Sequence, residues 1–418
     1  MKCCLIAPMH FLFKNMKTII FSTILLLTIA CNHTLKKADD QEVATKSVIN
    51  SNETFRYDHD LLKKHKDIVV LEKDSMKVLI VPGYQARVMT STSEGMDGLS
   101  YGWINHALID TGKYMPHINA YGGEERFWMG PEGGQFALFF KKGQPFDFKN
   151  WQTPAIMDTV TFDLVHKQSD AASFTRSFSI ENYSGTIFQV SANREIKLLE
   201  KTDAEQVLGT PFDDLKWVGY QTTNSITNTG NEDWNRSKGV LSIWLLNMMK
   251  ASPNNTVIIP YKKGGGNLVN DSYFGKVPAE RLKKKDSVLL FTADSKYRSK
   301  IGLPPAIVKP FAGSYDALRN VLTIIQFDYK GDSDYVNSKW EVQQSPYKGD
   351  VINAYNDGPN ESGSQLGAFY ELETSSPAVP LKKGQTLTHV QRTFHFEGLK
   401  EQLNAIATKL LGMHLNDL

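Results

Sequence analysis

Short apolar runs separated by turn-forming residues fill most of the chain. The runs are rich in Val, Ile, Phe and Tyr and are bounded by Gly, Asn, Asp and Pro, a pattern typical of β-strands. The clearest runs are KVLIVPGYQARVMTST, GQFALFF, SFTRSFSI, GTIFQVSANREIKLL, VLSIWLLNMM, NTVIIPY, SVLLFTA, NVLTIIQFDY, DVINAYND and LTHVQRTFHF. Helical periodicity is clear only near the C-terminus, at Leu399, Leu403, Ile406 and Leu410. The pattern predicts an all-β fold, a large antiparallel β-sandwich with a short C-terminal helix.

The N-terminus is predicted to be a signal peptide with a lipid attachment site. The stretch MKTIIFSTILLLTIAC has a lysine, an apolar run from Thr18 to Ile29, a small residue and then Cys31. The run is short for a membrane span, and its ending LLTIAC is typical of a bacterial lipobox. We therefore expect residues 1–31 to be the signal peptide and Cys31 to be lipidated, which anchors the protein in a bacterial cell envelope. Met16 is an alternative translation start.

A polar tether and one large domain are predicted to follow the signal. Residues 32–53 are polar and poor in aromatic side chains, as in a flexible linker. Residues 54–418 contain all the remaining strand-like runs and form the β-sandwich domain. The three cysteines of the chain lie at or before the lipobox, at Cys3, Cys4 and Cys31. The domain therefore has no thiol for a disulfide, a zinc site or nucleophilic attack.

Composition and charge exclude several classes of function. The 418 residues are 41% hydrophobic and 22% charged, which is an ordinary globular composition. The formal net charge of +2 gives no basic footprint for nucleic acid. The glycine-rich KKGGGN run, residues 262–267, lacks the Lys-Ser or Lys-Thr of a phosphate-binding loop. No loop has EF-hand spacing, so the sequence predicts neither a metal nor a cofactor.

Two glutamates interrupt an otherwise apolar strand in the stretch FYELETSSPA. Side chains of an extended strand alternate, so Glu371 and Glu373 project from one face while Tyr370 and Leu372 project from the other. Two carboxylates then share one surface. That surface either faces solvent or lines a pocket that needs an acid.

The end of the chain resembles the galactose mutarotase (aldose 1-epimerase) family. Leu372-Glu373-Thr374 matches the family's strand motif, Lys383-Gly384-Gln385 matches its following turn, and RTFHF matches its closing strand. LIVPGYQARVMTST is similar to the family's opening strands. The resemblance implies a β-supersandwich, a carbohydrate ligand on its concave face, and Glu373 as the catalytic base. Glu371 faces the same way, and we expect it to form a salt bridge or a contact at the rim of the site.

Anomer interconversion needs an acid as well as a base, and the family's histidines are missing from the matching positions. Tyr121-Gly122-Gly123 stands where the family has His-Gly-Gly, and LSIWLLNMM has no histidine. His117 is the candidate substitute acid, and Tyr121 is a candidate hydrogen-bonding partner of the sugar. A glutamate base needs its pKa raised by burial or by a neighbouring carboxylate.

Two glycine-containing segments supply the remaining candidate ligand contacts. In YGGEERFWMGPEGG, an arginine can hold hydroxyls and a tryptophan can stack on a sugar face, unless the segment is a bulged hairpin with a structural ion pair. In YNDGP, the polar side chains either bind sugar hydroxyls or form the turn. The candidate residues of the two segments are Glu125, Arg126, Trp128, Glu132, Asn356 and Asp357.

The sequence thus predicts a lipid-anchored envelope protein that binds or processes a carbohydrate. One alternative is a glycoside hydrolase or lyase that pairs Glu373 with Glu125 or Glu132. The other is a non-catalytic sugar-binding module. In each case we expect Arg126, Trp128, Asp357 and Glu373 to converge on one pocket.

Overall fold

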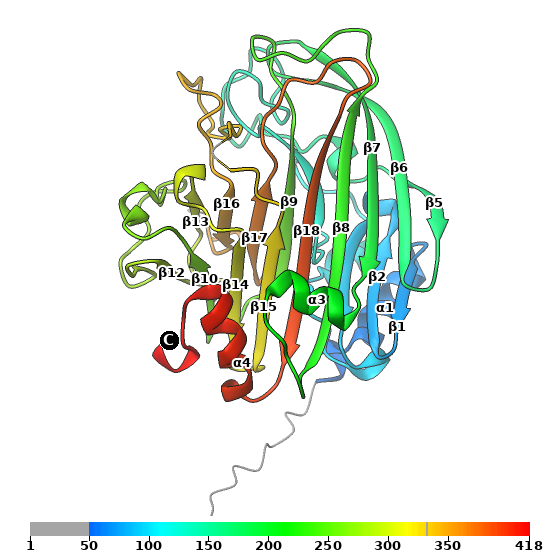
Figure 1. Cartoon of the computed structure of the whole chain (residues 1–418). Helices are drawn as coiled ribbons and strands as arrows, with labels where there is room; N and C mark the ends of the chain where they lie inside the picture. The colour runs from blue at the N-terminus through cyan, green and yellow to red at the C-terminus, as the bar shows by residue number, and fades with distance from the viewer. Residues whose placement is uncertain (1–49, 332, 361) are drawn as a thin grey trace, which may run out of the picture. The chain divides into compact units, whose positions relative to one another are not determined.

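The computed structural model describes residues 50–418 without 332 and 361. The strands of this part of the chain form three antiparallel sheets (Figure 1). The largest has ten strands in the order β11 (Leu282–Lys284), β12 (Val288–Thr292), β10 (Asn255–Pro260), β14 (Phe311–Asp316), β15 (Val321–Phe327), β18 (Thr386–Glu397), β8 (Lys216–Asn228), β7 (Ile187–Leu198), β6 (Ala171–Glu181) and β5 (Asp163–Lys167). The second has the order β13 (Ser299–Leu303), β16 (Ile352–Asn356), β17 (Phe369–Ser375), β9 (Ser242–Lys250) and β4 (Arg126–Gly130). The third contains β1 (Val69–Lys73), β2 (Met76–Val81) and β3 (Arg87–Thr92).

The two larger sheets pack face to face, as the alternation of their side chains requires. On β7 every second residue is buried, and on β17 the inner-facing Tyr370 and Thr374 reach across to the ten-stranded sheet. Tyr370 bonds with Ser314 of β14 at 2.6 Å, and Thr374 bonds with His389 of β18 at 2.9 Å. The predicted antiparallel β-sandwich is confirmed.

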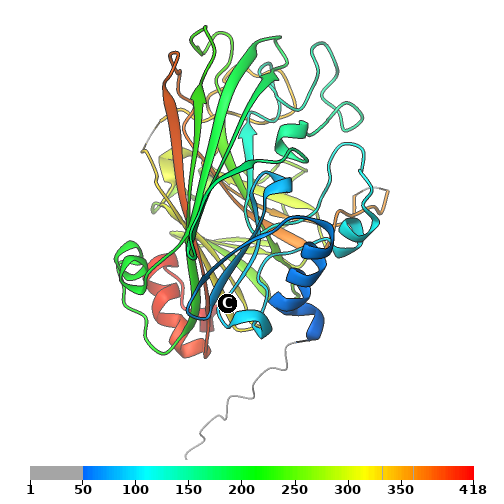
Figure 2. The ribbon, with the colours of Figure 1, turned by 90° about the vertical axis from the view of Figure 1, so that its right-hand side faces the viewer.

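Helices pack on two of the sheets. They are α1 (Phe55–His65), α2 (His106–Thr111), α3 (Lys201–Leu208) and α4 (Lys400–Ile406), the last continuing as a π-helical turn over Ala407–Leu411. The helices α3 and α4 pack on the ten-stranded sheet, and α1 and α2 pack with the three-stranded sheet. Leu403 and Ile406 of α4 pack on Phe394 and Phe396 of the ten-stranded sheet. Figure 2 shows α3 and α4 on the same side of the molecule. The predicted C-terminal helix is therefore confirmed, and none of the helices in the described residues is long and apolar enough to cross a membrane.

Two local predictions were wrong or incomplete. GQFALFF, Gly134–Phe140, contains no strand, because its backbone forms local turns, such as Ala137 N–H to the Gly134 carbonyl at 3.0 Å. The sequence reading also missed α1. Its signals are the capping Thr54, whose hydroxyl accepts from the Tyr57 N–H at 3.3 Å, and a basic last turn.

The start of the described region bears on the predicted tether. Residues 51–53 form a 3₁₀ turn, and the Glu53 carboxylate pairs with Arg319 at 2.6 Å. Residues 50–53 therefore belong to the folded unit. The signal peptide and the predicted lipid site at Cys31 lie outside the described residues.

Candidate functional site

The two glutamates of β17 lie on the face of the five-stranded sheet that points away from the ten-stranded sheet. Tyr370 and Thr374 point inward, so alternation directs Glu371 and Glu373 outward. Glu371 is nevertheless only 6% exposed and Glu373 only 1%. The solvent-facing interpretation is therefore wrong, because other parts of the chain cover this outer face.

Strand register brings two cations to these acids from opposite edges of the sheet. On one side, Lys300 of β13 pairs with Tyr355 of β16, which pairs with Glu371. On the other side, Arg126 of β4 pairs with Leu246 of β9, and Leu246 pairs with Glu373. We call Arg126, Lys300, Glu371 and Glu373 the charge cluster. Its four side chains share the outer face of five adjacent strands.

Glu373 forms the best-defined contacts of the charge cluster. Its Oε2 atom lies 2.9 Å from the Lys300 ammonium and accepts a hydrogen bond from the Trp244 indole N–H at 3.0 Å. Its Oε1 atom is buried and has no hydrogen-bond partner among the described residues. Burial works to lower the pKa of Lys300, but the charges of Glu373 and Glu132 outweigh it and raise that pKa. One oxygen of Glu373 is thus held by two donors, and the other is left to accept a hydrogen bond from a ligand.

Glu371 has a different environment. It forms an ion pair with Arg126, whose guanidinium also lies over the Trp128 ring at 4.6 Å from the ring centroid. Burial raises the pKa of Glu371 to about 7, with Arg126 opposing the shift and Glu373 adding to it. Near neutral pH the two acids of one strand therefore differ in role, since Glu371 can hold a proton beside the ion-paired Glu373.

The raised pKa of Glu371 predicts a pH dependence of stability. Between about pH 4.5 and pH 7 the folded state binds more protons than the unfolded state, so the unfolding free energy falls as pH rises. Above pH 7, the titration of this carboxyl has lowered the unfolding free energy by about 3 kcal/mol. In urea titrations from pH 4.5 to pH 8, Glu371→Gln should lack this part of the decline. The exposed control Glu401→Gln should follow the wild type, and a Glu371→Gln curve parallel to the wild type would contradict the assignment.

Trp128 and Trp244 contact the charge cluster, and further aromatic side chains pack beside them. Trp128 and Trp244, on adjacent strands, meet edge to face at 5.5 Å, and Trp151 stacks on Trp340 at 6.0 Å. Phe139 links the two pairs, at 5.2 Å from Trp128 and 5.8 Å from Trp151. We call these four tryptophans the tryptophan cluster. They place large flat apolar surfaces beside the charged groups.

A third acid reaches the same region from the connection after β4. Glu132 accepts from the Trp151 indole N–H at 3.0 Å. Burial raises the pKa of Glu132, with Glu373 adding to the shift and Lys300 opposing it. Glu132 is thus electrostatically linked to the charge cluster, and it remains half-buried. Its connection is held in place by the Glu132 N–H, which donates to Ser338 at 3.2 Å.

Asp357 lies at the border of the charge cluster. Its carboxylate accepts from the Tyr355 hydroxyl at 2.6 Å and from the Gly367 N–H at 2.9 Å. Burial raises the pKa of Asp357, and its charge contributes to the raised pKa of Glu371. Of the candidates from the sequence, the structure therefore brings together Arg126, Trp128, Glu132, Asp357, Glu371 and Glu373.

His117 lies outside the charge cluster, contrary to the expectation that it supplies the acid. Its Nδ1 atom bonds with the Trp151 carbonyl at 2.6 Å, and its ring packs on Phe148 at 4.7 Å. Its left-handed backbone, with φ of 68°, belongs to the turn that makes this contact. No hydrogen bond or ion pair among the described residues joins a histidine to Glu371 or Glu373.

Three other candidates have structural contacts instead. Tyr121 stacks on Tyr84 at 4.1 Å in a separate apolar cluster. Glu125 points into the core, where it pairs with the fully buried Arg194 at 2.7 Å. Asn356 accepts from the Ser295 N–H at 2.9 Å and so holds the turn before β13. These placements correct the predicted binding roles of Tyr121, Glu125 and Asn356, because each side chain already satisfies a partner elsewhere.

The sequence reading missed Lys300 and Trp244, which contact Glu373 directly. Tyr273 also belongs here, since Lys300 lies 5.6 Å from its ring centroid and Glu373 contributes to its raised pKa. The strongest available signal was the lone lysine in SKIGL, a short strand that pairs in register with DVINAYND. Across residues 50–418, apart from positions 332 and 361, no group of three or more His, Cys, Asp or Glu could hold a metal ion.

The fold and site define an antiparallel β-sandwich with a buried, covered pair of carboxyls on the outer face of its smaller packed sheet. The chain belongs to a family described as a family of unknown function, DUF6786, whose sequence profile matches residues 53–418. A search of curated proteins finds no match.

Solved structures similar to this chain include galactose mutarotase-like proteins. One, from Lactobacillus casei, has 10% identity and a TM-score of 0.44 over 79% of this chain and 99% of its own. A galactose mutarotase related enzyme from Lactobacillus acidophilus has 9% identity and a TM-score of 0.45 over 79% and 98%. The Slr1438 protein of Synechocystis has 12% identity and a TM-score of 0.47 over 80% and 96%. At these identities and TM-scores the likeness assigns no role to any residue of this chain.

Proposed function

We propose that the protein binds a carbohydrate at the charge cluster and that Glu373 and Glu371 act on it as base and acid. The observation that carries this proposal is the buried pair of carboxyls, two residues apart on β17, in unlike environments. Glu373 is paired with Lys300 and Trp244, whereas burial raises the pKa of Glu371 to about 7. Two neighbouring carboxyls in unlike environments, one of them with a raised pKa, are typical of general acid and base catalysis.

The surroundings of the pair suit a ligand with apolar faces and polar edges. The tryptophan cluster offers flat rings for the C–H faces of a sugar. Three buried polar atoms lack partners among the described residues: the Glu373 Oε1 acceptor and the Trp128 Nε1 and Arg126 Nε donors. Hydroxyl groups both donate and accept hydrogen bonds, so a sugar can satisfy both kinds of atom.

A thermal-shift screen of monosaccharides and short glycans tests this binding. A ligand at about 100 times its dissociation constant stabilises the folded state by about 2.7 kcal/mol. Trp128→Phe removes one of the unpartnered donors and should reduce the shift, whereas Trp234→Phe, a buried tryptophan packed on Phe188, should not. The absence of a shift with every sugar, or equal shifts in both variants, would contradict the proposal.

A non-catalytic sugar-binding module is the second candidate. Glu371 and Glu373 each already pair with a cation, an arrangement that also suits a rigid binding surface. This candidate is favoured if the wild type shows no turnover and Glu373→Gln only loses affinity for the sugar.

The proposal extends to the cell envelope through Cys31, which follows an apolar run and Ala30 and precedes a polar segment. Metabolic labelling with a fatty acid should tag the wild-type protein and leave Cys31→Ala unlabelled. The other N-terminal cysteines supply the control, because Cys3→Ala with Cys4→Ala should keep the label. Equal labelling of Cys31→Ala would remove the lipid anchor from the proposal.

A further inference from the structure

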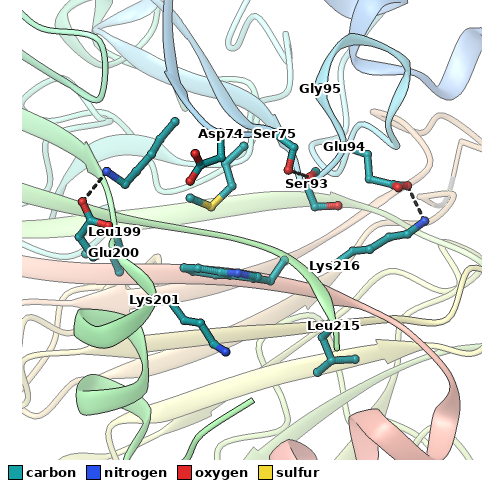
Figure 3. Close-up of a pocket in the computed structure, with 13 residues that line it drawn as sticks. Asp74, Ser75, Ser93, Glu94, Gly95, Leu199, Glu200, Lys201, Leu215 and Lys216 are labelled. Carbon is teal, nitrogen blue, oxygen red and sulfur yellow. Dashed lines mark hydrogen bonds and ion pairs between the residues drawn. The ribbon is translucent and has the colours of Figure 1, made fainter. Parts of the chain in front are cut away.

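An open cleft of about 650 Å³ lies between the three-stranded sheet and the start of α3 (Figure 3). Its walls come from the β1–β2 turn, the end of β3, and the segments that open α3 and β8. A volume of this size is within the roughly 300 to 1,000 Å³ range of ligand clefts. None of the charge cluster residues lines it.

Two ion pairs form opposite sides of this cleft. Lys73 pairs with Glu200 on one side, and Lys216 pairs with Glu94 at 2.6 Å on the other. In Figure 3, Glu200 and Lys216 lie across the opening from each other. These pairs join separate segments of the chain, so the side chains of the rim are held at a fixed spacing.

An aromatic and apolar surface lies between the two pairs. Trp217 is half-buried among the lining residues, with Met76 and Leu199 beside it in the same cleft. Phe212 meets the Trp217 ring edge to face at 5.0 Å and thereby fixes its position. A half-exposed indole with charged hydrogen-bonding groups at its edges suits a ring that is apolar on its face and hydroxylated around it.

The charge balance selects the class of ligand. The lining contains three lysines and three acidic residues, so their formal charges cancel. Lys73 and Lys216 are engaged by carboxylates, which leaves no free cationic pair for a phosphate or a polyanion. We propose that this cleft is a second binding site, for a neutral oligosaccharide, separate from the charge cluster.

Native gels that contain soluble starch, galactomannan, xyloglucan or mixed-linkage β-glucan test this site. At least one of these neutral polysaccharides should retard the wild-type protein. Trp217→Ala should weaken that retardation about tenfold, the order expected for one aromatic contact. The double variant Glu94→Ala with Lys216→Ala alters only exposed side chains and should also weaken it, which covers the case of a misfolded Trp217→Ala. Lys63→Ala, exposed on α1, is the matched control and should behave as wild type.

The outcomes separate this cleft from the charge cluster. If no neutral polysaccharide retards the protein, or if the Trp217 and rim variants behave as wild type, the inference is overturned. Retardation that is lost in Trp128→Phe but kept in Trp217→Ala would also overturn it, while supporting the charge cluster as the carbohydrate site. Stronger retardation by anionic polygalacturonate than by every neutral polysaccharide would overturn the choice of ligand class.

Discussion

Glu373→Gln is expected to remove most turnover of a carbohydrate substrate, by about 100-fold or more, while leaving binding nearly intact. The amide keeps the shape of the side chain and one hydrogen-bonding oxygen, but it cannot take a proton. Glu373 pairs with Lys300 at 2.9 Å, and its Oε1 atom has no partner among the described residues, so the proposed proton abstraction depends on this carboxyl. The exposed Glu401→Gln should leave turnover unchanged.

Turnover is measured by three assays on each sugar that binds: polarimetry, release of reducing ends, and absorbance of a newly formed double bond. With fresh α-glucose and α-galactose we expect weak or no mutarotation by the wild type, because no histidine among the described residues forms a hydrogen bond or ion pair with either carboxyl. Rapid equilibration that disappears in Glu373→Gln would instead restore the full mutarotase mechanism. If Glu373→Gln only weakens binding, by about 1 to 3 kcal/mol, the site is a binding module.

Arg126→Met is expected to lower the unfolding free energy by about 3 kcal/mol at pH 8. The guanidinium is the ion-pair partner of Glu371, and both side chains are almost fully buried. Removing one partner of a buried pair leaves an uncompensated charge, which is costly above the raised pKa of Glu371. The measurement is urea denaturation monitored by tryptophan fluorescence and by circular dichroism.

The loss of unfolding free energy in Arg126→Met should depend on the burial of the ion pair and on its partner, Glu371. Arg236→Met, which breaks the partly exposed pair with Asp334, should cost less than about 1 kcal/mol. Combining Arg126→Met with Glu371→Leu should recover part of the stability, since no charge then remains unpaired. If Arg126→Met and Arg236→Met cost the same, Glu371 is not a buried charge in the folded protein.

The sequence predicted what strand period and turn chemistry determine. Alternation placed Glu371 and Glu373 on one face, and the expected salt bridge of Glu371 is present, with Arg126. The sandwich class followed from many short strands without alternating helices.

The sequence did not predict contacts that depend on strand pairing across long separations. Lys300 and Trp244 lie 73 and 129 positions from Glu373, and only the register of β13, β16, β17 and β9 brings them to it. Burial of the outer face was also unpredictable, because Trp151 joins Glu132 and Phe139 from a separate connection of the chain. His117 was misassigned since its distance in sequence from Tyr121 does not reveal its bond to the Trp151 carbonyl.

The most direct test of the charge cluster as a carbohydrate site is a crystal structure of the protein with a sugar from the thermal-shift screen. We expect the sugar on the outer face of the five-stranded sheet, with a hydroxyl within hydrogen-bond distance of the Glu373 Oε1 atom and another at the Trp128 indole N–H. A monosaccharide bound elsewhere at saturating concentration, with the Glu373 Oε1 atom and the Trp128 indole N–H still without partners, would contradict the proposed site.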